Sequence, residues 1–239
     1  VYSIHTAVCV ENKKPLMFCL DVDLSGQKHV EALLRHRAER ALHLQAVLLD
    51  LAKGNFPDIP AAVRRILDIA ADALEIERTG VWWYNPAEYT IVCGEISSQY
   101  GKLPDKRVTI SMCEQSIFFR AVEENRVIMM EEGMEDLLAA GFMTDYMRRN
   151  GITSILLVPI WIHGEFIGIL SIEHTGLART WTPEEQQFAV SVADIIALAR
   201  ESTDRRAAEE ALRASEKRYR DIFELIPISI WEYDFSDTI

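Results

Sequence analysis

The chain has 239 residues, of which 49% are hydrophobic and 26% charged, an ordinary composition for a soluble globular protein. Its 25 basic and 37 acidic residues give a formal net charge of −12, which argues against nucleic acid as a partner, because a nucleic-acid binder needs a basic surface to displace counterions. No apolar run approaches the ~18 residues that span a bilayer, so we expect no direct membrane contact.

The four cysteines bear on the compartment. Cys9, Cys19, Cys93 and Cys113 form no CxxC pair, so zinc and thioredoxin signatures are absent. Isolated cysteines with apolar neighbours are usually small core residues. We therefore expect a reducing, cytoplasmic setting and, because the chain lacks a signal peptide and an initial Met, an internal slice of a longer protein.

Residues 1–26 predict a β-hairpin. Candidate strands at 4–10 and 16–22 flank a polar turn. The junction that follows, Asp21 to Asp23, resembles the end of a PAS domain, where a short acidic stretch leads into a helix; Asp23 stands where PAS domains commonly carry Thr. The resemblance implies a signalling junction, and the simpler alternative is a capped turn.

Residues 27–53 predict a helix with an apolar heptad stripe. The two positions of the repeat are occupied by Val30, Arg37, Leu44 and Leu51, and by Leu34, Ala41 and Leu48. A stripe this narrow favours a parallel coiled coil between two copies of the chain, and Arg37 would help to fix its register. Val30, Leu34, Leu44, Leu48 and Leu51 are then the expected dimer seam. The alternative is a helix that lies on its own domain, and the two arrangements can coexist.

The middle of the chain alternates between helices and strands. The expected helices are a segment from Asp58 or Pro60 to Leu74, a second at 114–124, and a helical or helix-rich segment at 134–150. The expected strands lie at 79–84, 89–96, 107–111 and 126–130.

Residues 151–174 contain the strongest strand signal. Two long apolar runs, 154–162 and 166–172, are joined at His163-Gly164, where glycine suits a primed hairpin turn. Strands that are apolar on both faces are buried on both faces. We therefore expect this hairpin at the centre of a six-stranded, mostly antiparallel sheet that is covered by helices.

The last long helix has a clear start. Thr182 is the expected N-cap, Pro183 the first helical residue and Glu185 the partner in a capping box. The helix should bury one face near Phe188 and then continue as a charged connector. A second heptad stripe is formed by Ala208, Leu212, Ser215, Tyr219, Ile222 and Ile226. Residues 216–234 resemble the opening of another PAS domain.

Together, these features in this order resemble a GAF domain over about residues 54–200. The matching residues are Ser154, Leu156, Val158, Pro159, Ile160, Gly164, Gly168, Ile169, Leu170, Arg179, Trp181, Thr182, Glu184, Glu185 and Phe188. The resemblance implies an α+β fold with a six-stranded GAF sheet and long coiled-coil-like linker helices. The implied divisions are a PAS end at 1–26, a linker helix at 27–53, GAF at 54–200, a signalling helix at 201–219 and a PAS start at 220–239.

GAF domains bind ligands between the sheet and a variable cover, here about residues 97–150. The resemblance therefore makes pocket candidates of Met112, Cys113, Phe119, Met129, Phe142, Met143, Tyr146 and Glu173. Methionines and aromatics can line an adaptable pocket. The alternative is that these side chains fill a core, as such residues commonly do.

Two known GAF ligands are disfavoured. In the comparison with phytochrome-type GAF domains Tyr146 matches, but Phe142 replaces the chromophore Cys, Met143 the following His and Glu173 a pocket His. A covalent bilin is therefore not expected. The Asn-Lys…Phe…Asp-Glu motif of cyclic-nucleotide GAF domains is missing within the domain as well.

No catalytic or metal-binding motif appears in the sequence, so we expect no enzymatic activity in this slice. The expected function is a regulatory module of a bacterial-type sensor protein, with a histidine kinase or diguanylate cyclase output domain elsewhere in the same chain. The expected partners are a second copy and an unidentified small molecule. The alternative is a ligand-free dimerisation scaffold.

Overall fold

A computed structural model describes residues 2–9, 15–22, 25–54, 58–98, 108–112, 116–131 and 142–225, with the backbone alone described up to residue 26. The elements are β1 (Tyr2–Cys9), β2 (Pro15–Val22), α1 (Ser25–Ala52), α2 (Ile59–Leu74), β3 (Arg78–Asn85), β4 (Thr90–Ser98), β5 (Thr109–Ser111), α3 (Ser116–Glu124), β6 (Ile128–Glu131), α4 (Phe142–Asn150), β7 (Ser154–Ile162), β8 (Glu165–His174) and α5 (Pro183–Leu225). None of the helices in these ranges is long and apolar enough to cross a membrane.

The main sheet has six strands in the order β5-β4-β3-β8-β7-β6, and every neighbouring pair is antiparallel. The predicted α+β class is confirmed. The β7–β8 hairpin lies inside the sheet as expected but off its centre, because the two central strands are β3 and β8. Its turn has positive φ at His163 (51°) and Gly164 (82°), the backbone of a primed turn. The N-terminal hairpin prediction is confirmed as well, because β1 and β2 form a separate two-stranded sheet.

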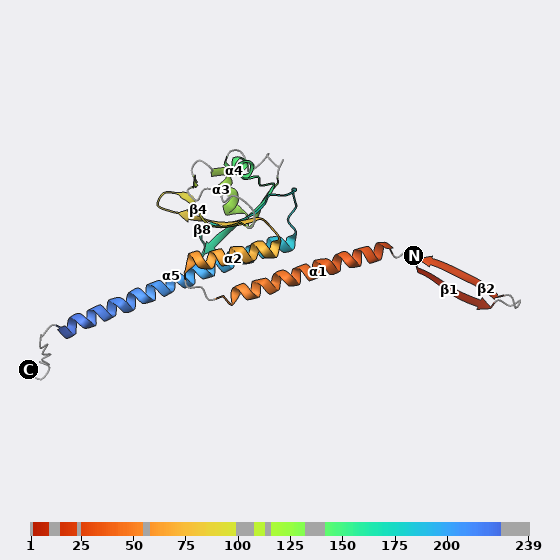
Figure 1. Cartoon of the computed structure of the whole chain (residues 1–239), viewed down its shortest axis with the longest axis horizontal. Helices are drawn as coiled ribbons and strands as arrows, with labels where there is room; N and C mark the ends of the chain where they lie inside the picture. Colours follow the sequence, from red (N-terminus) through yellow and green to blue (C-terminus); the bar gives the residue numbers. More distant parts are fainter. Residues whose placement is uncertain are drawn as a thin grey trace, which may run out of the picture.

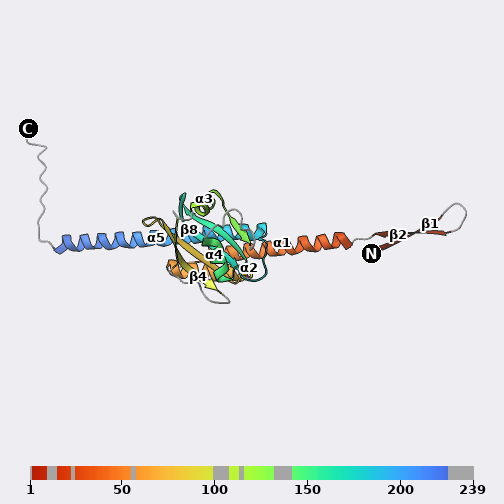
Figure 2. The ribbon, with the colours of Figure 1, turned by 90° about the horizontal axis from the view of Figure 1, so that it is seen from above.

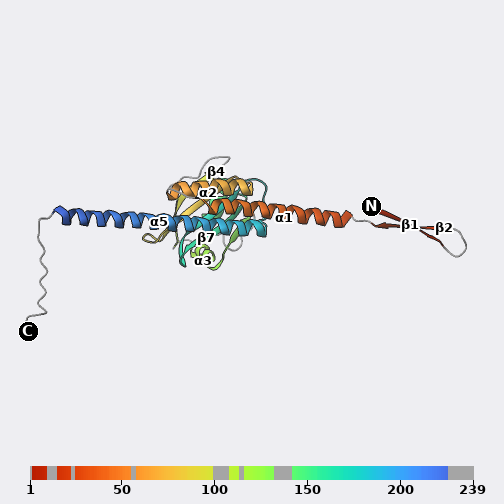
Figure 3. The same ribbon diagram turned by 90° about the horizontal axis from the view of Figure 1, so that it is seen from below.

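Helices cover both faces of the main sheet (Figure 1). One face carries α2 and the first half of α5, and the end of α1 packs on these two helices; the three are seen side by side from below (Figure 3). The other face carries the short helices α3 and α4, seen in front of the sheet from above (Figure 2). Each face of the sheet has its own apolar core, so the sheet separates two hydrophobic cores.

The sequence predicted how α5 begins. The Glu185 backbone N–H donates to Thr182 Oγ1 at 3.2 Å, and the Thr182 N–H donates to Glu185 Oε2 at 3.0 Å, which is a capping box. Arg179 forms an ion pair with the same carboxylate. The cap thus fixes α5 at the point where it joins the domain.

Thr182→Ala is expected to lower the free energy of unfolding by about 1 kcal/mol, because one amide at the start of α5 loses its acceptor. Urea unfolding measures the change. Thr175→Ala, in an exposed loop, is the matched control and should leave the midpoint in place. A Thr182→Ala midpoint equal to that of wild type would mean that the cap contributes nothing.

The predicted dimer-seam residues of α1 fall into a buried group and an exposed group. Leu44 and Leu51 are only 3% and 2% exposed and pack against α2 and α5 of the same chain, and Leu48 is half-buried against the same core. Val30 and Leu34 are exposed, at 54% and 59%. The seam expectation therefore needs correction at Leu44 and Leu51, whose apolar surface is already covered within the protomer. The alternative of a helix on its own domain describes this half of α1.

Helix α5 is a single helix of 43 residues with two different environments. Its first half buries Phe188, Ala189, Val192 and Ile196 against the sheet and α2. From Asp204 to Ala214 every residue is exposed. The helix therefore leaves the domain and extends away from it, in the direction opposite to the exposed part of α1 (Figure 1).

Candidate functional site

A small cavity lies among the described residues of the α3–α4 face, where the pocket was expected. This cavity, of about 20 Å³, lies between the sheet and these helices, with room for about one water molecule. It is lined by Trp82, Ile91, Ile110, Phe118, Met143, Tyr146, Ile155, Leu157, Ile169, Ser171 and Glu173. Three of the predicted pocket residues, Met143, Tyr146 and Glu173, are brought together here.

The other predicted pocket residues lie elsewhere. Met112 and Phe119 are buried in the same core but do not line the cavity. Met129 is 42% exposed, because β6 is an edge strand whose alternate side chains face away from the core. Cys113 and the Phe142 side chain lie outside the described residues.

A buried polar cluster borders this cavity. Arg78, at the start of β3, forms an ion pair through Nε with Glu173 Oε2, at the end of β8. The other carboxylate oxygen accepts hydrogen bonds from Tyr146 Oη at 2.9 Å and Ser171 Oγ at 3.0 Å. One acid thus ties together two strands and the cover helix α4.

The Tyr146 hydroxyl is a lasting hydrogen-bond donor of this cluster. Burial, with the Glu173 charge nearby, raises the pKa of the Tyr146 phenol far above its ordinary value, so the hydroxyl keeps its proton. Arg78 Nη2 is buried and has no hydrogen-bond partner within the described residues, so it is an unused donor.

Sequence reasoning missed Arg78 and Ser171. A register in which β3 and β8 pair puts Arg78 directly opposite Glu173, and Ser171 shares the face of Glu173 because it lies two residues earlier on the same strand. The sequence signal that could have pointed to a partner for Glu173 is that this acid lies near the end of a largely apolar strand that contains no Lys or Arg. Chemically, the cluster can hold a hydrogen-bonding group, and the described residues contain no cluster of three metal-ligating side chains.

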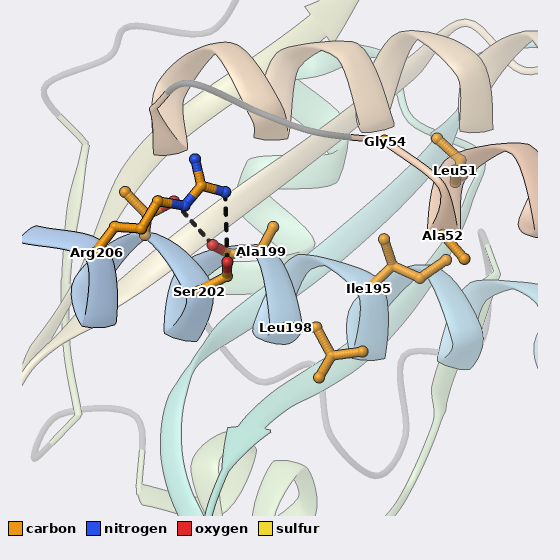
Figure 4. Close-up of a pocket in the computed structure, with 9 residues that line it drawn as sticks. Leu51, Ala52, Gly54, Ile195, Leu198, Ala199, Ser202 and Arg206 are labelled. Atoms are coloured by element: carbon orange, nitrogen blue, oxygen red, sulfur yellow. Dashed lines mark hydrogen bonds between the residues drawn. The ribbon is translucent and has the colours of Figure 1, made fainter.

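The helix face has hollows along the contact between α1 and α5. One, of about 220 Å³, lies where α1 ends; Leu51, Ala52 and Gly54 face Ile195, Leu198, Ala199, Ser202, Thr203 and Arg206 of α5 (Figure 4). Another, of about 290 Å³, lies near the start of α5 and is lined by Leu44 and Leu48 among others. Leu198 is 63% exposed beside the first hollow. The two helices thus present an incompletely filled apolar surface.

Comparison with known structures identifies the fold. The phycocyanobilin-bound GAF domain of a cyanobacterial phytochrome is 14% identical, with a TM-score of 0.56, 69% of this chain covered and 94% of that one. The GAF domain of a phosphoenolpyruvate-protein phosphotransferase from Coxiella burnetii is 15% identical, with a TM-score of 0.57 and coverage of 70% and 98%. The bacteriophytochrome RpBphP3 of R. palustris is 12% identical, with a TM-score of 0.59 and coverage of 79% and 43%. At these identities the likeness concerns the fold alone.

The sequence itself carries a family assignment. Residues 58–199 match the GAF domain family, and this match includes neither end of the chain. No curated protein sequence matches significantly. GAF domains are common sensory and regulatory modules of signalling proteins and are typically non-catalytic. With more than half of its residues in the match, the chain belongs to the GAF domain family.

Proposed function

We propose that this chain is a non-catalytic sensory module of a multidomain signal-transduction protein. A change at the α3–α4 face is relayed through α1 and α5 to an output domain of the same protein, of the histidine kinase or diguanylate cyclase type. The observation that carries this proposal is α5, because one uninterrupted helix is built into the core of the domain and then leaves it. A displacement of its buried half must displace the exposed half.

Homodimerisation belongs to the same proposal. The exposed half of α5 carries Leu212, Tyr219 and Ile222 on one stripe, all at least 46% exposed, and α1 exposes Val30 and Leu34. Apolar residues at heptad spacing on a projecting helix are what a parallel coiled coil uses. In such a dimer the apolar stripes of the two copies would pack against each other, and each copy would cover the hollows between α1 and α5 of the other.

The ends of the chain fit such an architecture. We propose that residues 1–26 are the end of one PAS domain and residues 220–239 the start of another. The β1–β2 hairpin directly before α1 agrees with the first assignment. The second rests on the sequence resemblance, and residues 226–239 lie outside the described part of the chain.

A ligand-free dimerisation scaffold is the second candidate. The cavity beside Tyr146 and Glu173 favours it, because among the described residues its volume is only about 20 Å³ and a small-molecule pocket usually measures about 300–1,000 Å³. Ligand entry would require α4 to move away from the sheet. In the sensory function a ligand acceptor would satisfy the buried Arg78 Nη2, and in the scaffold a single water would do so.

Native mass spectrometry of the chain purified from cells tests both candidates. We expect a dimer that retains the extra mass of a small organic molecule. A dimer without added mass would support the ligand-free scaffold. A monomer would contradict the proposed homodimerisation. Leu212→Glu with Tyr219→Glu should abolish the dimer by placing like charges in the seam. Leu177→Glu is the matched control, because Leu177 is 91% exposed in a loop outside either stripe.

A further inference from the structure

The place where α5 leaves the domain is held by a specific contact. The Arg200 guanidinium lies over the Trp83 ring of β3, 4.8 Å from its centroid. Arg200 also pairs with Asp204 at 3.5 Å, and His163 in the β7–β8 turn lies 3.3 Å from Glu201. From Asp204, one turn further along the helix, to Ala214 all side chains are exposed. Arg200 thus stands at the last point where the sheet can direct α5.

Trp83 is itself held in place. Its Nε1 lies 3.3 Å from Glu95 Oε2. Gly94 lies directly beneath the ring, and a Cβ at this position would come within 2.6 Å of the indole. Gly94 and Glu95 of β4 therefore help to position the ring under the guanidinium.

Trp82, the preceding residue, points to the opposite face. It is 5% exposed and meets the Tyr146 ring of α4 edge to face, with centroids 5.5 Å apart. Tyr146 is the cavity residue that donates to Glu173. Consecutive residues of one strand thus contact the cover helix on one side of the sheet and the departing helix on the other.

We infer that the Trp82–Trp83 pair couples the two faces of the sheet: Arg200 on Trp83 sets the direction in which α5 leaves the domain, and Tyr146 on Trp82 makes this contact sensitive to the seating of α4. The inference rests on the proposed relay role of α5 and names its route. A shift of α4 moves Trp82, and the backbone of β3 that the two residues share transmits the shift to Trp83.

Hydrogen exchange of the full chain, followed in peptides covering residues 200–206, tests the anchor. Arg200→Ala should raise exchange there about two- to five-fold, the factor that corresponds to a cation–π contact of 0.5–1 kcal/mol. Arg205→Ala is the matched control, because Arg205 is exposed on the same helix and pairs only with Glu209 among the described residues. Equal effects of the two variants, or none from Arg200→Ala, would overturn the anchor.

The coupling is tested at Tyr146. Tyr146→Leu removes the ring from Trp82 and should alter exchange at residues 200–206, whereas Tyr146→Phe keeps the ring and should alter it less. In an Arg200→Ala background Tyr146→Leu should have no further effect there. Independent, additive effects would overturn the coupling. Sedimentation velocity on each variant separates these outcomes from loss of the dimer, so failure of the coupling and failure of the proposed dimer are distinguishable.

Discussion

Replacing Arg78 with methionine is expected to lower the free energy of unfolding by about 3–5 kcal/mol, because it leaves the Glu173 carboxylate buried without its cation. The pair is 6% and 2% exposed in its side chains, so water cannot take over the role of the guanidinium. Among the described residues, the hydroxyls of Tyr146 and Ser171 would remain as partners of the charge. Urea unfolding at neutral pH measures the loss.

A second substitution identifies the cause. Glu173→Gln in the Arg78→Met background removes the charge but keeps an oxygen that accepts from Tyr146 and Ser171, so it should recover most of the lost stability. Arg149→Met is the matched control: Arg149 is 80% exposed, and its loss should change stability by no more than about 0.5 kcal/mol. A cost below about 1 kcal/mol for Arg78→Met would show that the carboxylate is not isolated from solvent.

Leu44→Ala and Leu34→Ala should separate the two roles of α1. We expect Leu44→Ala to lower the free energy of unfolding of the protomer by about 2–5 kcal/mol, because Leu44 is buried against α2 and α5. Leu34→Ala should change it by less than about 0.5 kcal/mol and should instead weaken the dimer, because this leucine is exposed on the projecting half of the helix.

Urea unfolding and sedimentation equilibrium at several protein concentrations separate folding from association, since the apparent stability of a dimer depends on concentration. If both variants reduced protomer stability equally, α1 would be packed along its whole length. If Leu34→Ala left the dimer constant unchanged, the exposed stripe of α1 would have no part in association.

Features that depend on near neighbours in the chain could be read from the sequence. The Thr182–Glu185 capping box needs only residues three apart, and the His163-Gly164 turn needs a glycine that tolerates positive φ between two apolar runs. The interior position of the β7–β8 hairpin also followed from its composition, because strands that are apolar on both faces are not expected at the edge of a sheet.

The candidate site was harder to predict from the sequence, because its residues come from different strands and meet only in the folded sheet. Arg78 and Glu173 are 95 residues apart, and only the pairing of β3 with β8 brings them together. Met129 shows the same limit. A methionine is a suitable residue type for a pocket, but the register of edge strand β6 turns Met129 towards solvent and its neighbour Met130 towards the core. A shift of one residue would have exchanged the two.

The sequence by itself determined the GAF family through its resemblance to that family, the α+β architecture through the apolar patterns of its strands and helices, and the start of α5 through its capping box. Only the tertiary structure decided how one heptad stripe is used. Leu34 and Leu44 have the same apolar character, yet one is 59% exposed and the other 3%. The physical reason is that burial depends on what lies opposite: α2 and α5 cover the end of α1, and its first half extends beyond them.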